Sequence, residues 1–341
     1  MTAPASRQNG FSLIEMMIGM ALALVLAAVI VTVFSRASKT SSVTQTINEI
    51  QEQARVAVDM MQQDVRLAGY IGCNSNRLLD SGGLVNVIDT PTGYLNDIDQ
   101  YVMGHEGTGM AFDPAPAAGA GLATAAPAPL PDSDAITVRI PAAEPVSLSG
   151  TMANGTAAIP LFSTDGFAVG QRAIVGDCTQ STAFYVTGVD PDELQHADGA
   201  GLNANANFGR AYGPDAMVAP FTTLTYYIAE NGVGTNRSLY RRVGNAALSE
   251  EIAEGVEEFQ LQYGLDTDGD IFADLFVTAD DVADWSQVVS VRASLLMRSK
   301  LERAAQSPQV YDFNGVPDIA SADDRLRRPF NVTIQLRNRT L

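Results

Sequence analysis

The chain has 341 residues, hydrophobic residues make up 46% of it, and its formal net charge is −18 at pH 7. This length suits one large domain or two modest ones. A strongly acidic chain repels the phosphates of nucleic acid, so direct binding of nucleic acid is not expected. Acidity favours solubility and leaves carboxylates available to hard cations.

An apolar run dominates the N-terminal region. Residues 16–35 carry no formal charge, and about 20 helical residues span the ~30 Å hydrocarbon core of a bilayer. A short polar leader precedes the run, and Glu15 is the only acid at its edge. Gly10 stands before the run, whereas a secretory signal places its small-residue cleavage site after the apolar region. Cleavage at Gly10 would therefore leave the apolar segment on the mature protein.

This arrangement resembles the leader of type IV pilins, here residues 1–10. In that family a dedicated peptidase cuts after the glycine, methylates the new N-terminal phenylalanine and requires an acid as the fifth mature residue. The resemblance assigns these roles to Gly10, Phe11 and Glu15. It also pairs Glu15 with the N-terminal amine of a neighbouring subunit, and such a pair would offset the ~2.5–3.5 kcal/mol cost of an acid in a bilayer. The alternative is a plain membrane anchor with an incidental glutamate.

A helical pattern continues beyond the apolar run. Apolar residues recur there every three or four positions, which predicts an amphipathic helix. No proline interrupts residues 11–69, and Gly69 is suited to end the helix. We therefore expect one helix of ~85 Å, with a transmembrane part at 11–35 and an amphipathic continuation at 36–69.

The remaining residues, 70–341, are predicted to form a β-rich head. Runs of β-branched and aromatic residues predict strands at 84–88, 136–140, 172–175, 182–189, 222–230, 237–243, 256–263, 288–297 and 330–336. Two segments rich in small residues, 104–134 and 190–220, are predicted to be long loop insertions. The predicted class is α+β and pilin-like, with the long helix packed on an antiparallel sheet.

Cys73 and Cys178 are the only cysteines. The pilin resemblance places everything after Ser35 outside the cytoplasm, in an oxidising space where two cysteines tend to pair. We therefore expect a disulfide that ties the end of the long helix to the sheet. The alternative is two unrelated buried thiols.

An acidic segment offers a candidate calcium loop with four carboxylates: Asp266, Asp268, Asp270 and Asp274. Alternating oxygen ligands are typical of calcium loops, and the pilin superfamily includes calcium binders. Ile271 replaces the glycine of an EF-hand loop, and no glutamate stands at the twelfth position. An acidic turn facing solvent is the alternative, and no other cofactor is expected.

The sequence carries no catalytic pattern. His105 and His196 are the only histidines, and neither has a serine, cysteine or paired acid at a spacing that indicates nucleophilic catalysis. A phosphate-binding glycine loop, a zinc spacing and a nucleophile elbow are also missing. We expect a structural protein and not an enzyme.

Within the pilin superfamily the chain is similar to the PilW family of minor pilins. The similarity is carried by DVRLAGYIGC at 64–73, GDCTQSTAFYVTGV at 176–189, VVSVRASLLMRS at 288–299 and RPFNVTIQLRNR at 328–339. It implies single-pass storage in the inner membrane with the head in the periplasm, followed by incorporation into the pilus.

The same similarity implies the partners, which are prepilin peptidase, other minor pilins and the major pilin. The expected role is in a complex that primes pilus growth and sits at the tip, so that adhesion, twitching motility and DNA uptake depend on it indirectly. The alternatives are a J-type pseudopilin of type II secretion and a tip adhesin. The two insertions lack the aromatic density of a binding hot spot, which disfavours the adhesin.

Overall fold

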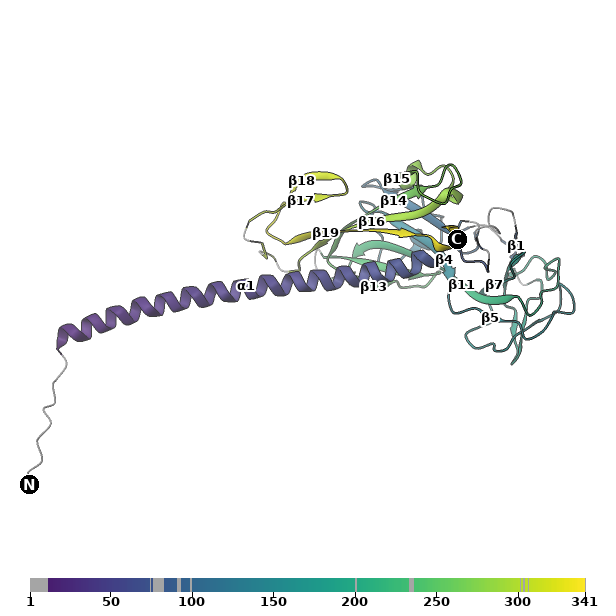
Figure 1. Ribbon diagram of the computed structural model, residues 1–341, viewed down its shortest axis with the longest axis horizontal. Coiled ribbons are helices and arrows are strands. Elements are labelled where there is room, and N and C mark those ends of the chain that lie inside the picture. Colours follow the sequence, from purple (N-terminus) through teal and green to yellow (C-terminus); the bar gives the residue numbers. More distant parts are fainter. Residues whose placement is uncertain are drawn as a thin grey trace, which may run out of the picture.

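The computed structural model describes residues 12–340 except 74, 76–82, 91–92, 99, 200, 233–235, 301, 303 and 306. One long helix, α1 (Leu13–Leu67), projects from a β-rich head, and its first half extends well beyond that head (Figure 1). The predicted α+β class, with a long N-terminal helix and mainly antiparallel sheets, is confirmed.

The boundaries of α1 agree with the sequence pattern. The helix has 55 residues, contains no proline and ends at the cap residue Ala68. Gly69 follows with φ +77°, the left-handed conformation that glycine readily adopts after a helix. The short C-terminal helix α3 (Arg337–Thr340) lies beside this end, and the Asn338 amide donates hydrogen bonds to the carbonyl oxygens of Leu67 and Ala68.

The largest sheet contains ten strands within the described residues, and β11 (Met217–Glu230) is its longest member. The start of β11 pairs with β5 and β7, and its later part pairs with β4 and β12, so this strand connects the two ends of the head. β1 and β8 pair in parallel at one edge. The other members are β1 (Leu84–Asn86), β2 (Val102–Gly107), β3 (Phe112–Asp113), β4 (Ala135–Pro141), β5 (Val146–Ser147), β7 (Arg172–Gly176), β8 (Ser181–Tyr185), β12 (Arg237–Val243) and β13 (Glu250–Glu254).

A second, antiparallel sheet has the strand order β15-β14-β16-β19. Its strands are β14 (Val256–Leu265), β15 (Leu275–Val277), β16 (Val288–Arg298) and β19 (Arg327–Gln335). Two small sheets complete the described strands, namely β6 (Ile159–Pro160), β9 (Gly188–Val189) and β10 (Glu193–Gln195), and the hairpin of β17 (Val310–Phe313) and β18 (Val316–Ala320). Single 3-10 turns are η1 (Gly121–Thr124), η2 (Ala279–Asp281) and η3 (Trp285–Gln287).

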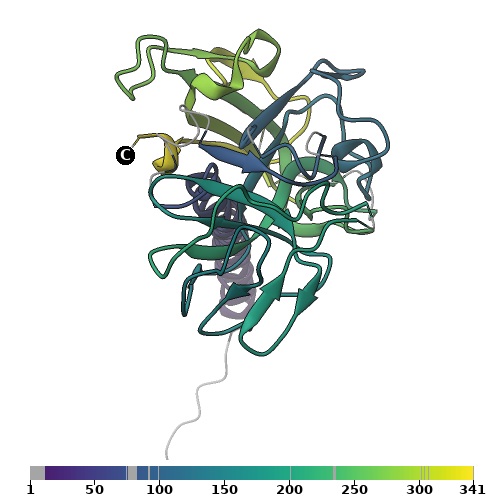
Figure 2. The ribbon, with the colours of Figure 1, turned by 90° about the vertical axis from the view of Figure 1, so that its right-hand side faces the viewer.

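Two large hydrophobic cores lie along β11. The first joins α1 to β4, β11, β12 and the four-stranded sheet. The second lies in a lobe at the end of the head away from the free half of α1, and the viewer of Figure 2 faces this lobe. Its buried aromatic residues are Phe184, Phe208 and Tyr212.

Both predicted insertions carry more structure than their composition indicates. The segment 104–134 contains β3, η1 and the buried Leu122, and the segment 190–220 contains β10 and the buried Phe208 and Tyr212. The buried apolar residues of both segments do not recur with the period of a helix or a strand, so the sequence pattern does not reveal them. The strand predicted at 182–189 is divided into β8 and β9.

Candidate functional site

The start of α1 is closed by a reciprocal pair of hydrogen bonds. Ser12 is the N-cap, its hydroxyl accepts the Glu15 N–H at 3.4 Å, and the Glu15 carboxylate accepts the Ser12 N–H at 3.0 Å. This capping box satisfies two backbone donors that a helix start otherwise leaves unpaired. Gly10 and Phe11, the predicted processing residues, lie outside the described residues.

The capping box gives Glu15 a role within its own chain. A carboxylate in an apolar helix needs a hydrogen-bond donor or a counter-charge, and here one carboxylate oxygen is bonded to the Ser12 N–H. The predicted pairing with a neighbour's N-terminal amine would use the remaining acceptor capacity of this exposed carboxylate. The cap and the predicted pairing with a neighbouring subunit are therefore distinct roles for one side chain.

The first half of α1 is not packed against the head. Its apolar side chains from Leu13 to Phe34 are exposed, and the helix is long and apolar enough to cross a membrane. Contiguous apolar surface of this extent marks a membrane or protein contact. The N-terminal half of the helix is therefore available for contact with a membrane or with other proteins.

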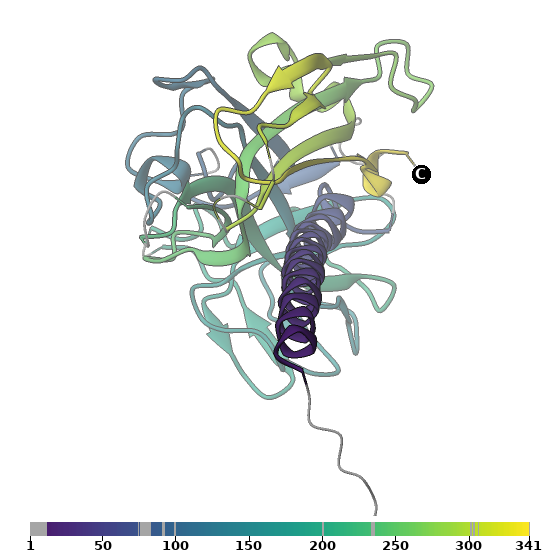
Figure 3. The same cartoon turned by 90° about the vertical axis from the view of Figure 1, so that its left-hand side faces the viewer.

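The second half of α1 lies in the first core. The predicted apolar stripe is confirmed, because its members are buried or half-buried: Val43, Ile47, Ile50, Ala54, Val58, Met61 and Val65. Figure 3 looks along α1 and shows the helix lying against one side of the head. Gln53 adds a polar contact, since its side-chain oxygen accepts the N–H of Glu254 in β13. The helix and head are thus packed as one unit.

A buried acid, Asp64, fixes the helix to three strands. Asp64 is only 7% exposed, it accepts a hydrogen bond from the Tyr226 hydroxyl, and it forms an ion pair with Arg241 at 3.3 Å. Arg241 also pairs with Glu250 at 2.8 Å. Tyr226, Arg241 and Glu250 are cross-strand neighbours on β11, β12 and β13. Burial raises the pKa of Tyr226, and the nearby negative charge of Asp64 raises it further. The hydroxyl therefore stays protonated and can donate its hydrogen bond.

The end of α1 is fixed to the second lobe by the predicted disulfide. Cys73 and Cys178 are bonded with their Cα atoms 5.2 Å apart. Nearby, the Ser181 hydroxyl donates to the carbonyl oxygen of Ile71. Gly176 allows this approach, because a Cβ there would lie 2.8 Å from the same oxygen. The disulfide therefore holds the segment after α1 on the turn between β7 and β8.

We predict that replacing both cysteines by serine lowers the free energy of unfolding. The bond closes a separation of 105 residues, for which chain entropy gives about 4–5 kcal/mol and measured cases give about 2–4 kcal/mol. Thermal unfolding of the full chain in detergent, with and without reductant, measures the loss. Reductant should shift the melting temperature of the wild type and leave that of Cys73→Ser/Cys178→Ser unchanged. Alkylation of both wild-type thiols without reductant would contradict the pairing.

The acidic loop brings three of its four carboxylates together. Asp266, Asp268 and Asp274 can each place one oxygen within 4.8 Å of the other two. Asp270 is not in this group, and its carboxylate accepts the N–H of Phe272 at 2.9 Å. The departure at Ile271 does not prevent a loop conformation, since Ile271 has φ 69° and can occupy the left-handed region usually taken by glycine.

The same carboxylates also have donors within the loop. Asp266 accepts the N–H groups of Gly269 at 2.7 Å and Ile271 at 2.9 Å. Hydrogen bonds from the Thr267 side chain and backbone hold the pKa of Asp274 below its usual value. The loop is therefore held by its own backbone, and the geometry is compatible both with a cation and with an ordinary acidic turn.

The histidines have structural positions. His105 and His196 are buried, and each bonds through a ring nitrogen to a backbone carbonyl, that of Pro114 at 2.6 Å and that of Ala157 at 2.8 Å. Burial lowers the pKa of both imidazoles. Both imidazoles therefore hold backbone segments in place within the head.

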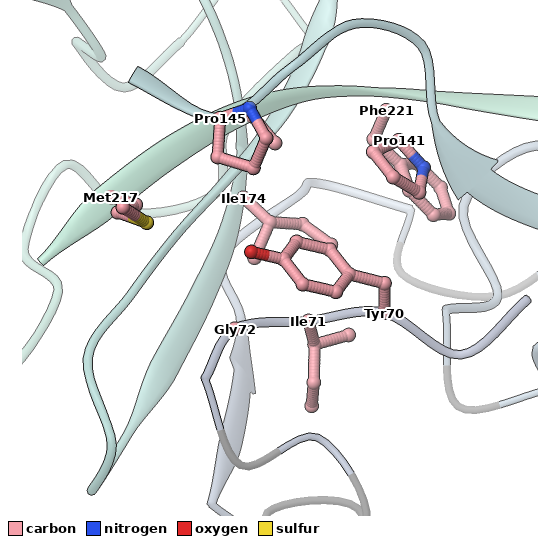
Figure 4. A pocket seen from close by; sticks show the side chains of 9 residues that line it. Tyr70, Ile71, Gly72, Pro141, Pro145, Ile174, Met217 and Phe221 are labelled. Carbon is pink, nitrogen blue, oxygen red and sulfur yellow. The ribbon is translucent and has the colours of Figure 1, made fainter. Parts of the chain in front are cut away.

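A shallow apolar hollow lies where the chain leaves α1. Tyr70 reaches toward Pro145 and Ile174 there, beside Pro141 and Met217 (Figure 4). Its volume is about 10 Å³, room for no more than one water molecule. Small-molecule sites occupy roughly 300–1,000 Å³, so this hollow does not suit a cofactor.

Two buried acids were not predicted as important. The sequence gives an indication that Asp64 is buried, because this charged residue adjoins the apolar stripe between Met61 and Val65. No sequence pattern indicates that Asp134 is buried. Its carboxylate accepts the N–H groups of Gly107 and Leu261, and these hydrogen bonds join β2 to β14. Burial raises the pKa of Asp134 to about 7, against the lowering effect of those N–H groups.

Two known protein-family models match parts of this chain. Residues 5–31 match the prokaryotic N-terminal methylation motif, and residues 225–338 match the family described as Type IV Pilus-assembly protein W. The C-terminal third of the chain thus matches the PilW family, and the N-terminus matches the methylation motif. No curated protein and no solved structure matches it. The family matches describe a structural pilin of the type IV pilus system, with an N-terminal helix that anchors it in a membrane.

The PilW match covers most of the strands that pack against α1, and β4 lies outside it. It begins within β11 and ends after β19, and it includes Tyr226, Arg241 and Glu250. Of the four segments that carried the sequence similarity, 288–299 lies inside the match and 328–339 lies inside it except for its last residue, whereas 64–73 and 176–189 lie outside it. The matched range thus contains the four-stranded sheet and the strands β12 and β13, and the second lobe and the disulfide lie outside it.

Proposed function

We propose that this protein is a minor pilin that is stored in the inner membrane with its head in the periplasm and joins other minor pilins in a complex that primes pilus growth. Its final position would be the pilus tip. The observation that carries the proposal is the exposed apolar half of α1, which continues without a break into a helix packed in the head. Such a helix can pass from a bilayer into a filament because both environments cover the same apolar surface.

The partners proposed are prepilin peptidase, other minor pilins and the major pilin. The peptidase would act on the leader before assembly, and the pilins would cover the exposed half of α1. Adhesion and twitching motility would follow from pilus number. An enzymatic activity is not part of the proposal.

Affinity purification of the full-length, tagged protein from membranes tests this proposal. After cross-linking, the expected companions are other minor pilins and the major pilin. Companions from a type II secretion system alone would overturn it in favour of a J-type pseudopilin. A deletion strain with a normal number of pili and lost surface attachment would instead indicate a tip adhesin.

We also propose calcium binding at the acidic loop, on the proximity of the carboxylates of Asp266, Asp268 and Asp274. Calcium should then raise the melting temperature of the full chain in detergent, because a ligand selective for the folded state adds about 2.7 kcal/mol at 100 times its dissociation constant. Asp268→Ala should abolish the rise. Asp270→Ala is the matched control and should keep it, since Asp270 lies outside the group.

The two results separate a site from a general charge effect. Equal loss in both variants would indicate screening of a repulsive acidic loop. Calorimetric titration without heat, together with an unchanged melting temperature, would leave the loop as an acidic turn.

A further inference from the structure

A large groove separates α1 from the end of the head nearest to the exposed half of the helix. Its volume is about 900 Å³, within the range of sites that hold small organic groups. The helix side carries Arg36 and Lys39, and the head side carries Glu302 and Asp324. Figure 1 shows this end of the head, with the β17–β18 hairpin, beside the middle of α1. We call this feature the juxtamembrane groove.

The position of the groove follows from the apolar run. The uncharged segment ends at Ser35, so Lys39 lies ~6 Å further along the helix at ~1.5 Å per residue. The headgroup layer of a bilayer is about 5–7 Å thick on each side of the hydrocarbon. When the first half of α1 spans a membrane, Arg36 and Lys39 therefore lie at headgroup level.

The two walls carry opposite charges, and three of the four groups form no ion pair with a described residue. Arg36 and Lys39 are exposed, and neither forms an ion pair with a described residue. On the head wall, Glu302 pairs with Arg325 at 3.2 Å, whereas the half-buried Asp324 pairs with no described residue. The Asp324 backbone is held in place, because its carbonyl oxygen accepts the Ala305 N–H at 2.8 Å.

We propose that the juxtamembrane groove binds the headgroup of a phospholipid that carries a primary ammonium, with its phosphate on Arg36 and Lys39 and its ammonium on Asp324. The proposal rests on the membrane storage proposed above. A phosphate accepts hydrogen bonds from both cations, and a primary ammonium donates three. A choline headgroup has no N–H to donate, and a glycerol headgroup leaves Asp324 without a cation.

Lipid retention by the full-length protein tests the groove. The chain is reconstituted into vesicles of phosphatidylethanolamine, phosphatidylcholine and phosphatidylglycerol in equal amounts, extracted in mild detergent, and its bound lipids are counted by native mass spectrometry. Wild type should retain phosphatidylethanolamine over phosphatidylcholine by roughly threefold to fivefold, the factor that one partly exposed ion pair supplies.

Variants test whether the preference for phosphatidylethanolamine arises in the juxtamembrane groove. Arg36→Gln should lower the retention of all three phospholipids, because their phosphate is common to them. Asp324→Asn should abolish the preference for phosphatidylethanolamine, and Asp324→Glu should restore it. The matched controls Asp318→Asn, in β18, and Arg55→Gln, on the exposed face of α1, change the same charges outside the groove and should retain it.

The outcomes separate this proposal from the function on which it rests. Carbonate extraction of the same vesicles reports whether α1 is inserted. Insertion with equal retention of the lipids, or a preference that survives Asp324→Asn, would overturn the groove site and leave membrane storage standing. A groove filled by another subunit's helix would give that result. A chain that carbonate removes from the vesicles would overturn the membrane storage and the groove site together.

Discussion

Asp64→Ala should destabilise the head by about 2–3 kcal/mol, because it leaves a buried hydroxyl without its acceptor and removes one ion pair of a half-buried arginine. The fully buried Tyr226 loses its acceptor, whereas Arg241 keeps only its pair with Glu250. Urea unfolding of the full chain in detergent, followed by the fluorescence of Trp285, measures the change. The midpoint should fall while the slope stays constant.

The matched control is on the same helix. Asp59 forms an exposed ion pair with Arg55, one turn apart, and Asp59→Ala should cost no more than about 0.5 kcal/mol. Tyr226→Phe combined with Asp64→Ala should cost less than the sum of the two single changes, because both remove one hydrogen bond. If Asp64→Ala and Asp59→Ala cost the same, the account of how the helix is fixed to the strands is wrong.

Glu15→Ala should leave membrane insertion intact and reduce incorporation of the subunit into pili by roughly tenfold or more, which corresponds to about 1.4 kcal/mol of lost pairing. Insertion becomes easier because an acid leaves the apolar helix, a gain of about 2.5–3.5 kcal/mol. Incorporation falls because the neighbour's N-terminal amine loses its counter-charge. Quantitative mass spectrometry of sheared pili and of membranes measures both pools.

The capping box allows cap and charge to be separated. Glu15→Gln keeps an oxygen that can accept the Ser12 N–H but removes the charge, so it should fail in assembly as Glu15→Ala does. Ser12→Ala removes the N-cap hydroxyl, at about 1 kcal/mol, and keeps the charge, so its incorporation should stay near that of the wild type. If Glu15→Gln assembles normally while Ser12→Ala does not, the glutamate serves the helix cap and not the neighbouring subunit.

The long helix and most strands could be predicted because their signals are local. The stripe from Val43 to Val65 repeats with the helical period, and Gly69 has the conformation that stops a helix. The strands predicted at 222–230 and 237–243 from β-branched and aromatic residues correspond to β11 and β12. The cysteine pair followed from the compartment that the pilin resemblance implied.

The rest depends on contacts between segments far apart in the chain. Phe208 and Tyr212 lie in a stretch of small residues without a period, and only the second core gives them their burial. Asp134 becomes a joint between β2 and β14 through backbone donors, which no side-chain pattern reveals. The acidic spacing suggested four equivalent ligands, whereas loop geometry brings together three and turns Asp270 to its own backbone.

The N-terminal peptide of the protein recovered from sheared pili tests the central claim most directly. Mass spectrometry should find a chain that begins at Phe11, carries one added methyl group on its amine and lacks residues 1–10. That result would show that the protein is processed as a pilin and enters the filament. Recovery of the intact Met1 leader from assembled pili, or absence of the protein from pili that still form in normal number in its deletion strain, would contradict the account.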